Sequence, residues 1–211
     1  AAAGPMPLAD INFYNKISDT DFRKLSWKAP AGSVLEGKNT YIDTATGAAL
    51  PEYASLKFRP GSGNMSDFNV GSACSYPMMR VEEMYFIEAE AAAQQNPAQG
   101  VNLLNDFMSN YRDPQYKCTK SSKEDVVKEI VFQKRVELWG EGQSFFDIKR
   151  LNLPVTRGYA GTLHHTIGRF NTTTRPAWMN FCIVRSEGNN NTALVGFENP
   201  DPSDVYSSWA E

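Results

Sequence analysis

The clearest hydrophobic pattern lies in the middle of the chain and begins near residue 76. Residues 78–95, MMRVEEMYFIEAEAAAQQ, combine strong helix formers with acidic residues early and alanines late. Pro77 stands where a first-turn proline is tolerated, and Asn96 with Pro97 ends the pattern. We therefore predict a helix of about 16 residues in this region.

A second amphipathic pattern follows after a short connection. Residues 98–112 carry apolar side chains at spacings of three and four, namely Val101, Leu104, Phe107, Met108 and Tyr111. The short link predicts an antiparallel pair, and the alanines of the first helix let the backbones approach closely, as in tetratricopeptide-type repeats. Because the first helix adds Met84, Tyr85 and Ile87, the pair has more apolar surface than two helices can bury between themselves. We expect another chain, or sequence outside these residues, to cover the remainder.

A third helix is predicted from its capping signal. Ser121 or Ser122 can serve as N-cap, because each is followed three residues later by an acid. The apolar positions between residues 126 and 139 cover much of the helix circumference, so we expect it to pack on more than one side. After Gly140 and Gly142, residues 144–151 predict a short further helix that ends before Pro154.

Both ends of the chain differ from the middle in amino-acid composition. Residues 1–75 are rich in Gly, Pro, Ser, Asn and Asp, and the sequence returns to such loops from residue 155. Residues 180–191, NFCIVRSEGNNN, contain one plausible short strand. The pattern predicts a mainly α fold: a tetratricopeptide-like helix pair plus further helices with long irregular loops. We expect one structural domain, with residues 1–75 as its loop-rich segment and residues 76–211 as its helical region.

Composition excludes several classes of function. The 211 residues carry a net charge of −3, and no run of Lys or Arg exceeds two, so no nucleic-acid partner is predicted. No apolar stretch approaches the roughly 20 residues of a membrane span, and residues 1–12 lack a signal-peptide pattern. Cys74, Cys118 and Cys182 form no CxxC pair and indicate either three thiols or one disulfide with one thiol.

The segment from residue 132 to residue 150 gathers charge around a glycine-containing break. Glu137 and Glu141 are helical neighbours, which suggests a two-carboxylate hydrolase, but carboxylates on one helical turn cannot flank a glycosidic bond from two sides. Nearby cations also keep such acids ionised. We therefore predict a buried, paired network that fixes helix positions. Its predicted members are Arg80, Glu90, Arg135, Glu137, Glu141, Asp147 and Arg150.

No other enzyme or cofactor signature is present. His164 and His165 are adjacent and come without an HExxH motif, so no metal site is predicted. The GEG at residues 140–142 lacks the GK[ST] of a phosphate loop, and no GxSxG accompanies a serine. We expect neither a cofactor nor a catalytic residue.

Aromatic residues in polar loops offer a binding chemistry instead. A flat ring stacks on the apolar face of a pyranose, while neighbouring amides and carboxylates bind the hydroxyls. The loops before the helix pair contain Trp27 and Tyr41, and a later loop contains Trp178. We predict Trp27 and Tyr41 as sugar-stacking residues, with Trp178 next; the alternative is that such rings fill the core beneath the loops.

Three of these segments together resemble the SusD/RagB family of outer-membrane glycan-binding lipoproteins of Bacteroidetes. Residues 76–91 resemble the family's Pro-x-x-Arg-x-x-Glu and Ala-Glu-Ala elements, and residues 103–112 its second helix with a closing Arg. Residues 134–150 resemble its Arg-Glu-Leu, Glu-Gly and Asp-x-x-Arg elements, although Arg135 and Glu137 stand one residue closer together than in the family pattern. The order and spacing of all three agree.

The resemblance implies a non-catalytic protein that captures oligosaccharide on the extracellular face of the outer membrane. It further implies delivery to a SusC-like TonB-dependent transporter and attachment to the membrane only through a lipid anchor outside this chain. Family members are roughly twice this length, so the chain is expected to be the C-terminal half of a longer protein. The alternatives are a glycan hydrolase that uses Glu137 and Glu141, or a protein-interaction module on a helix-pair scaffold.

Overall fold

The computed structural model describes residues 7–39, 49–58, 75–197 and 199. The chain divides into two compact units, Ala1–Glu141 and Gly142–Glu211, which are described separately below. The boundary that composition suggests near residue 75 stays a prediction.

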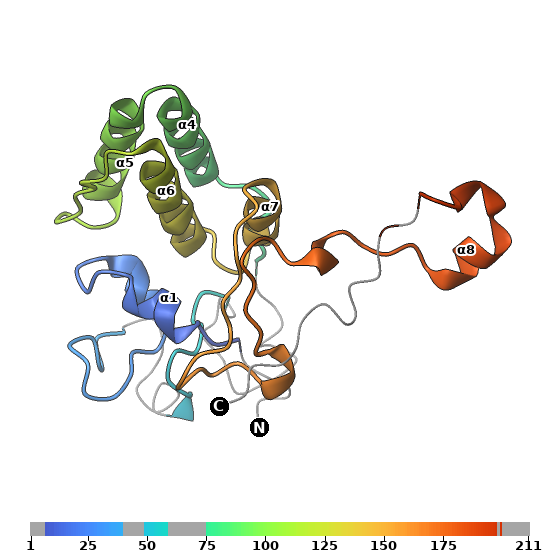
Figure 1. Cartoon of the computed structure of the whole chain (residues 1–211). Coiled ribbons are helices and arrows are strands. Elements are labelled where there is room, and N and C mark those ends of the chain that lie inside the picture. Colours follow the sequence, from blue (N-terminus) through green and yellow to red (C-terminus); the bar gives the residue numbers. More distant parts are fainter. Residues whose placement is uncertain (1–6, 40–48, 59–74, 198, 200–211) are drawn as a thin grey trace. The chain divides into compact units, whose positions relative to one another are not determined.

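Three helices of similar length form the upper part of the first unit (Figure 1): α4 (Val81–Gln95), α5 (Pro97–Tyr111) and α6 (Lys123–Glu137). The helix α4 packs against both α5 and α6, and α5 also contacts α6. Their bounds confirm the predicted helices to within a few residues. The capping signal is confirmed at Ser122, whose Oγ accepts from Asp125 N at 3.1 Å and donates to the Asp125 carboxylate at 2.8 Å.

Small residues bring α4 and α5 together, as the alanines predicted. Gly100 of α5 is buried, and a Cβ built on it would lie 2.8 Å from Ala93 Cα and 2.9 Å from Ala89 O. Ala89 and Ala93 are themselves fully buried. A side chain at position 100 would therefore push the two backbones apart.

A second, largely aromatic core lies beside α6 in the same unit. The short helix α1 (Ile11–Asn15) and the 3-10 turn η1 (Phe22–Ser26) contribute Phe13, Tyr14 and Trp27 to it, and α6 contributes Val136. Residues 53–56 run between residues 7–9 and 26–28, with isolated bridges between Leu8 and Ala54 and between Trp27 and Ser55. These backbone contacts hold a loop-rich segment over the end of α6.

The apolar surface of the helix pair is only partly buried, as expected. Leu104, Phe107 and Met108 of α5 are buried, whereas several large apolar side chains stay exposed: Val81, Met84, Tyr85, Ile87 and Tyr111. One side of α4 therefore presents a continuous apolar face, which we call the α4 face.

The second unit contains short elements joined by loops. They are α7 (Gln143–Arg150), η2 (Thr166–Gly168), η3 (Ala177–Met179), α8 (Arg185–Asn190) and η4 (Thr192–Leu194). The helix α7 confirms the prediction for residues 144–151. The strand predicted in residues 180–191 is wrong: residues 180–184 belong to no strand in the described part of the chain, and α8 begins at Arg185. Over the described ranges, no helix is both long and apolar enough to span a membrane.

Candidate functional site

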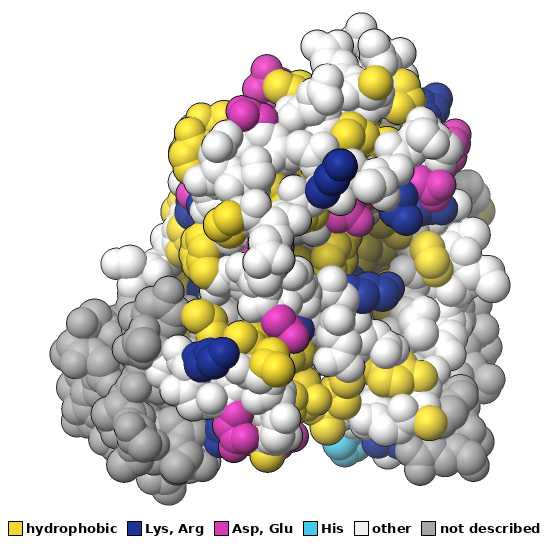
Figure 2. All heavy atoms as spheres, turned by 90° about the vertical axis from the view of Figure 1, so that its left-hand side faces the viewer, with side chains coloured by type: hydrophobic (Ala, Val, Ile, Leu, Met, Phe, Trp, Pro, Cys, Tyr) yellow, Lys and Arg dark blue, Asp and Glu magenta, His cyan; other side chains and the backbone are white. Residues whose placement is uncertain are grey.

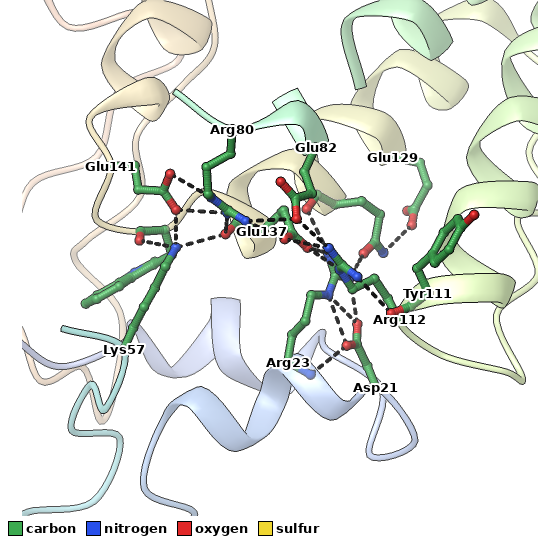
Figure 3. A network of polar contacts seen from close by, with 12 residues as sticks. Asp21, Arg23, Lys57, Arg80, Glu82, Tyr111, Arg112, Glu129, Glu137 and Glu141 are labelled. Carbon is green, nitrogen blue, oxygen red and sulfur yellow. Dashed lines mark hydrogen bonds and ion pairs between the residues drawn. The ribbon is translucent and has the colours of Figure 1, made fainter. Parts of the chain in front are cut away.

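Glu137, the last residue of α6, lies at the centre of a polar network (Figure 3). Its Oε2 accepts from Arg112 Nε at 2.8 Å and from Arg23 Nη1 at 3.2 Å. Its Oε1 accepts from Arg80 Nη1 at 3.1 Å and from Arg112 Nη2 at 3.1 Å. Three guanidinium groups from three different segments thus share one carboxylate.

Glu141 extends the network beyond the end of α6. Arg80 donates to both of its carboxylate oxygens, at 3.1 and 2.9 Å, and Lys57 forms an ion pair with it. Glu82, in the first turn of α4, accepts from Arg112 Nη2 at 3.1 Å. The network therefore joins the start of α4, the end of α5, the end of α6 and two loops.

The cations also satisfy the backbone at the end of α6. The last carbonyl groups of a helix have no intrahelical partner, and they carry partial negative charge. Lys57 Nζ donates to the carbonyls of Glu137 and Trp139 at 2.9 and 3.0 Å, and Arg80 Nη2 donates to Glu137 O at 2.7 Å. A carboxylate at a helix C-terminus is unfavourable by itself, and these cations offset that cost.

The ionisation of Glu137 follows from its surroundings. Burial alone would raise its pKa, but the hydrogen bond from Arg112 and the charges of Arg23 and Arg112 outweigh burial and lower the pKa to about 2. Burial lowers the pKa of Lys57, although its bond to Glu141 opposes this effect. Glu137 is therefore held as a carboxylate in the folded protein at neutral pH.

Three of the seven residues predicted for the network, Arg80, Glu137 and Glu141, meet in it. Glu90, Glu137 and Asp147 are buried, Arg80 bridges Glu137 and Glu141, and Asp147 pairs with Arg150 at 2.7 Å within α7. Two expectations of burial are wrong, because Arg135 and Arg150 are exposed. The Arg135 guanidinium lies over the Phe13 ring, 4.8 Å from its centroid.

The sequence-based prediction missed three of the four cations that contact Glu137 and Glu141. Arg23, Lys57 and Arg112 lie 114, 84 and 25 positions from the acids they contact. Arg112 closes a motif in residues 103–112, but nothing in the sequence connects it to Glu137. Only the packing of the three helices with η1 and the loop that contains Lys57 brings these residues together.

This geometry disfavours a hydrolytic role for Glu137 and Glu141. Their side chains are only 6% and 5% exposed, and both receive hydrogen bonds from the same guanidinium. A general acid must be protonated near the working pH and must reach the leaving group. Glu137, buried and with a pKa of about 2, meets neither condition, and the buried Glu141 side chain cannot reach a leaving group.

The predicted sugar-stacking residues have different fates. Trp27 is 1% exposed, so the expectation that its ring faces solvent is wrong. It packs edge-on against Phe13, Tyr14 and Trp139, with ring centroids 5.7, 6.4 and 5.6 Å apart. Its polar sequence neighbours conceal this burial, which arises from contact with α1 and the end of α6. Tyr41 lies outside the described residues, and its role stays a prediction.

Trp178, in the second unit, has the required exposure. The residue is 37% exposed and meets Phe170 edge-on, with ring centroids 6.0 Å apart. The Arg157 guanidinium lies over the Phe170 ring at 5.2 Å. Hydrogen bonds hold the backbone near these rings in place: Asn171 Oδ1 accepts from the backbone N–H groups of Arg157 and Gly158 at 3.0 and 2.9 Å. We call Trp178, Phe170 and Arg157 the Trp178 surface.

Fold and site together define a mainly helical protein in which the charges around Glu137 hold helices and loops in place, and Trp178 is an exposed ring of the second unit. The SusD family model matches residues 26–198, and the chain belongs to that family. A search of curated proteins gives no match. The crystal structure of a SusD-like carbohydrate-binding protein from Bacteroides vulgatus ATCC 8482 is similar, with a TM-score of 0.59 and 25% sequence identity. The similarity covers 95% of this chain and 43% of that one, so the chain spans less than half of the length of that protein.

Proposed function

We propose that the protein binds oligosaccharide without cleaving it, on the extracellular face of the outer membrane. Membership of the SusD family over residues 26–198 carries this proposal, and the similarity to a carbohydrate-binding protein supports it. The bound sugar would pass to a SusC-like TonB-dependent transporter. A lipid anchor outside this chain would hold the protein at the membrane.

The Trp178 surface is the contact that we propose for the sugar. The exposed indole face can stack on a pyranose ring, and the Arg157 side chain supplies donors for hydroxyl groups. The edge-on contact with Phe170 limits the orientations of the indole. Less ordering is then needed on binding, which favours affinity.

Binding of a panel of neutral oligosaccharides to the 211-residue chain tests this proposal. We expect Trp178→Ala to weaken binding about threefold to tenfold, which is the effect of losing one aromatic contact. Phe181→Ala is the matched control, because Phe181 is an aromatic residue 81% exposed in the same unit. Unchanged affinity in Trp178→Ala, or an equal loss in the control, would remove the Trp178 surface from the site. Release of shorter sugars during the assay would contradict the non-catalytic part of the proposal.

A further inference from the structure

A cavity of about 460 Å³ opens in the first unit, where the end of α1, the loop after α5 and one side of α6 meet. Figure 2 turns the left-hand side of Figure 1 toward the viewer and shows a surface that is hollowed, with charged side chains of both signs around the hollow. On α6 the lining residues are Asp125, Lys128, Glu129, Phe132 and Gln133. Their spacing of three and four places them on one helix face. The cavity contains no residue of the Trp178 surface.

The floor of the cavity is polar and buried. Asp21, Asp113 and Gln133 line it and are 3%, 2% and 6% exposed. Asp21 is neutralised by Arg23, with Nη2 at 2.6 Å, but Asp113 has no cation within ion-pair distance among the described residues. Within the described residues, its carboxylate accepts only at Oδ1, from Gln115 N at 3.0 Å. Its Oδ2 is therefore available to accept a hydrogen bond from a ligand.

A second acceptor is held in a fixed position beside Asp113. Glu129 Oε1 accepts from the Tyr116 hydroxyl at 2.7 Å and from Gln133 Nε2 at 2.8 Å. Gln133 Oε1 accepts in turn from Arg23 Nη2 at 2.5 Å, which ties the cavity to the network around Glu137. These bonds use one carboxylate oxygen of Glu129, and the other has no hydrogen bond within the described residues. Two buried or half-buried acceptors beside the rings of Tyr116 and Phe132 match the hydroxyls and the apolar face of a sugar.

The rim of the cavity has the opposite charge. Lys16, Lys120 and Lys128 line it, all three are exposed, and none has an ion-pair partner within the described ranges. The fourth charged rim residue, Asp125, is engaged by Ser122. A ligand that fits both the floor and the rim of the cavity needs hydroxyl donors at the end near the floor and an anionic group at the end near the rim. A neutral sugar would leave the three ammonium groups without a partner.

We propose that this cavity is a separate binding site for an acidic saccharide unit, one that carries a carboxylate together with hydroxyls, such as a uronate. The carboxylate lies among the three lysines, the hydroxyls donate to Asp113 and Glu129, and the ring packs against Tyr116 and Phe132. The choice of a saccharide rests on the proposed function, whereas the position of the site does not.

Calorimetric titration of the 211-residue chain with D-galacturonate and D-galactose tests this assignment. We expect D-galacturonate to bind about tenfold more tightly, because only it has the charge-assisted contact to lysine. Lys128→Gln should lower the galacturonate affinity about tenfold and leave galactose almost unchanged. Lys123→Gln is the matched control, since Lys123 is an exposed lysine of the same helix that does not line the cavity. Both variants change a solvent-exposed side chain, so the fold is expected to persist, as circular dichroism can verify.

Further outcomes separate the alternatives. Equal affinity for the two sugars, or no loss in Lys128→Gln, would overturn the proposal. Acetate that binds as tightly as galacturonate would show a carboxylate site without sugar recognition. Alanine that binds more tightly than galacturonate would show a site for a zwitterion. Either result would overturn the proposal. Trp178→Ala should leave galacturonate binding intact. Failure at the Trp178 surface is thus distinguishable from failure at the cavity.

Discussion

At the scale of single residues, Glu137 shows how one buried charge is made tolerable. Removing a carboxylate from water costs several kcal/mol unless its lone pairs are satisfied by cations of good geometry. Arg23, Arg80 and Arg112 provide this, and all three also contact other acids or carbonyls. The same guanidinium groups would lose their shared partner if Glu137 were neutralised.

The low pKa of Glu137 makes stability depend on acid. Its pKa lies near 4.5 when solvated and at about 2 in the folded protein, so folding favours the ionised form. The contribution is complete above about pH 4.5 and is lost as the pH falls from there through about 2, and it amounts to about 3 kcal/mol. We expect the free energy of unfolding of the wild type, measured with urea, to fall across this window.

Glu137→Gln should remove the contribution of ionised Glu137 to the free energy of unfolding, together with the pH dependence of that contribution. We expect a loss of about 3 kcal/mol at pH 7, because one buried and two half-buried arginines lose a charged partner. The variant should also show a flatter acid titration between about pH 4.5 and 2. Glu88→Gln is the control, since Glu88 is exposed on α4. A Glu137→Gln protein with wild-type stability at pH 7 would show that the network adds nothing to folding.

At the scale of elements, the close approach of α4 and α5 depends on one glycine. Gly100→Ala would place a methyl group against the backbone of Ala89 and Ala93, which cannot rotate away as a flexible side chain could. We expect a destabilisation of about 1 to 3 kcal/mol, the range for an overpacked interface. Urea unfolding, followed by helical circular dichroism, measures it.

Gly188→Ala provides the comparison for this substitution. Gly188 lies in α8, where an added Cβ meets nothing within 4 Å, so alanine should be neutral or slightly stabilising. Equal behaviour of the two variants would mean that α4 and α5 do not touch at Gly100.

The helices could be predicted from sequence because their signals are local. Spacing, capping at Ser122 and the Asn96–Pro97 break lie within the segments that they organise. The prediction of a strand near residue 182 was wrong because its signal is not local. A strand needs a partner, which the local sequence cannot show. The prediction that the Trp27 ring is exposed was wrong for the same reason. Its loop is polar in sequence, but α1 and Trp139 enclose the ring. The members of the Glu137 network at positions 80, 137 and 141 were predicted as a motif, whereas Arg23 and Lys57 required the fold.

At the scale of the whole molecule, the α4 face is the largest unpaired feature of the helix pair. Val81, Met84 and Ile87 are 65%, 45% and 46% exposed along it. Adjacent apolar side chains of this size normally mark a contact surface. The interaction-module alternative would use this face, and the longer parent protein expected from the sequence would cover it.

We expect the 211-residue chain to self-associate through the α4 face as its concentration rises. Met84→Lys combined with Ile87→Glu should shift the chain toward monomer, because charged side chains resist burial without partners. Sedimentation velocity over a wide concentration range measures this. Val34→Lys is the control, since Val34 is 61% exposed and lies far from α4 in sequence. A wild-type chain that stays monomeric throughout would contradict the expectation.

The position of Glu137 in the sequence also sets the order of folding events during protein synthesis. Arg23, Lys57, Arg80 and Arg112 all leave the ribosome before Glu137 and Glu141, which they contact across separations of up to 114 residues. Until α6 and Glu141 are made, the four cations lack Glu137 and Glu141 as acceptors, and the loop-rich segment has no helix end to cover. Long-range contacts of this kind slow folding, because chain closure is opposed by entropy before the contacts form. Emergence of residue 141 is therefore the event after which the nascent first unit can close.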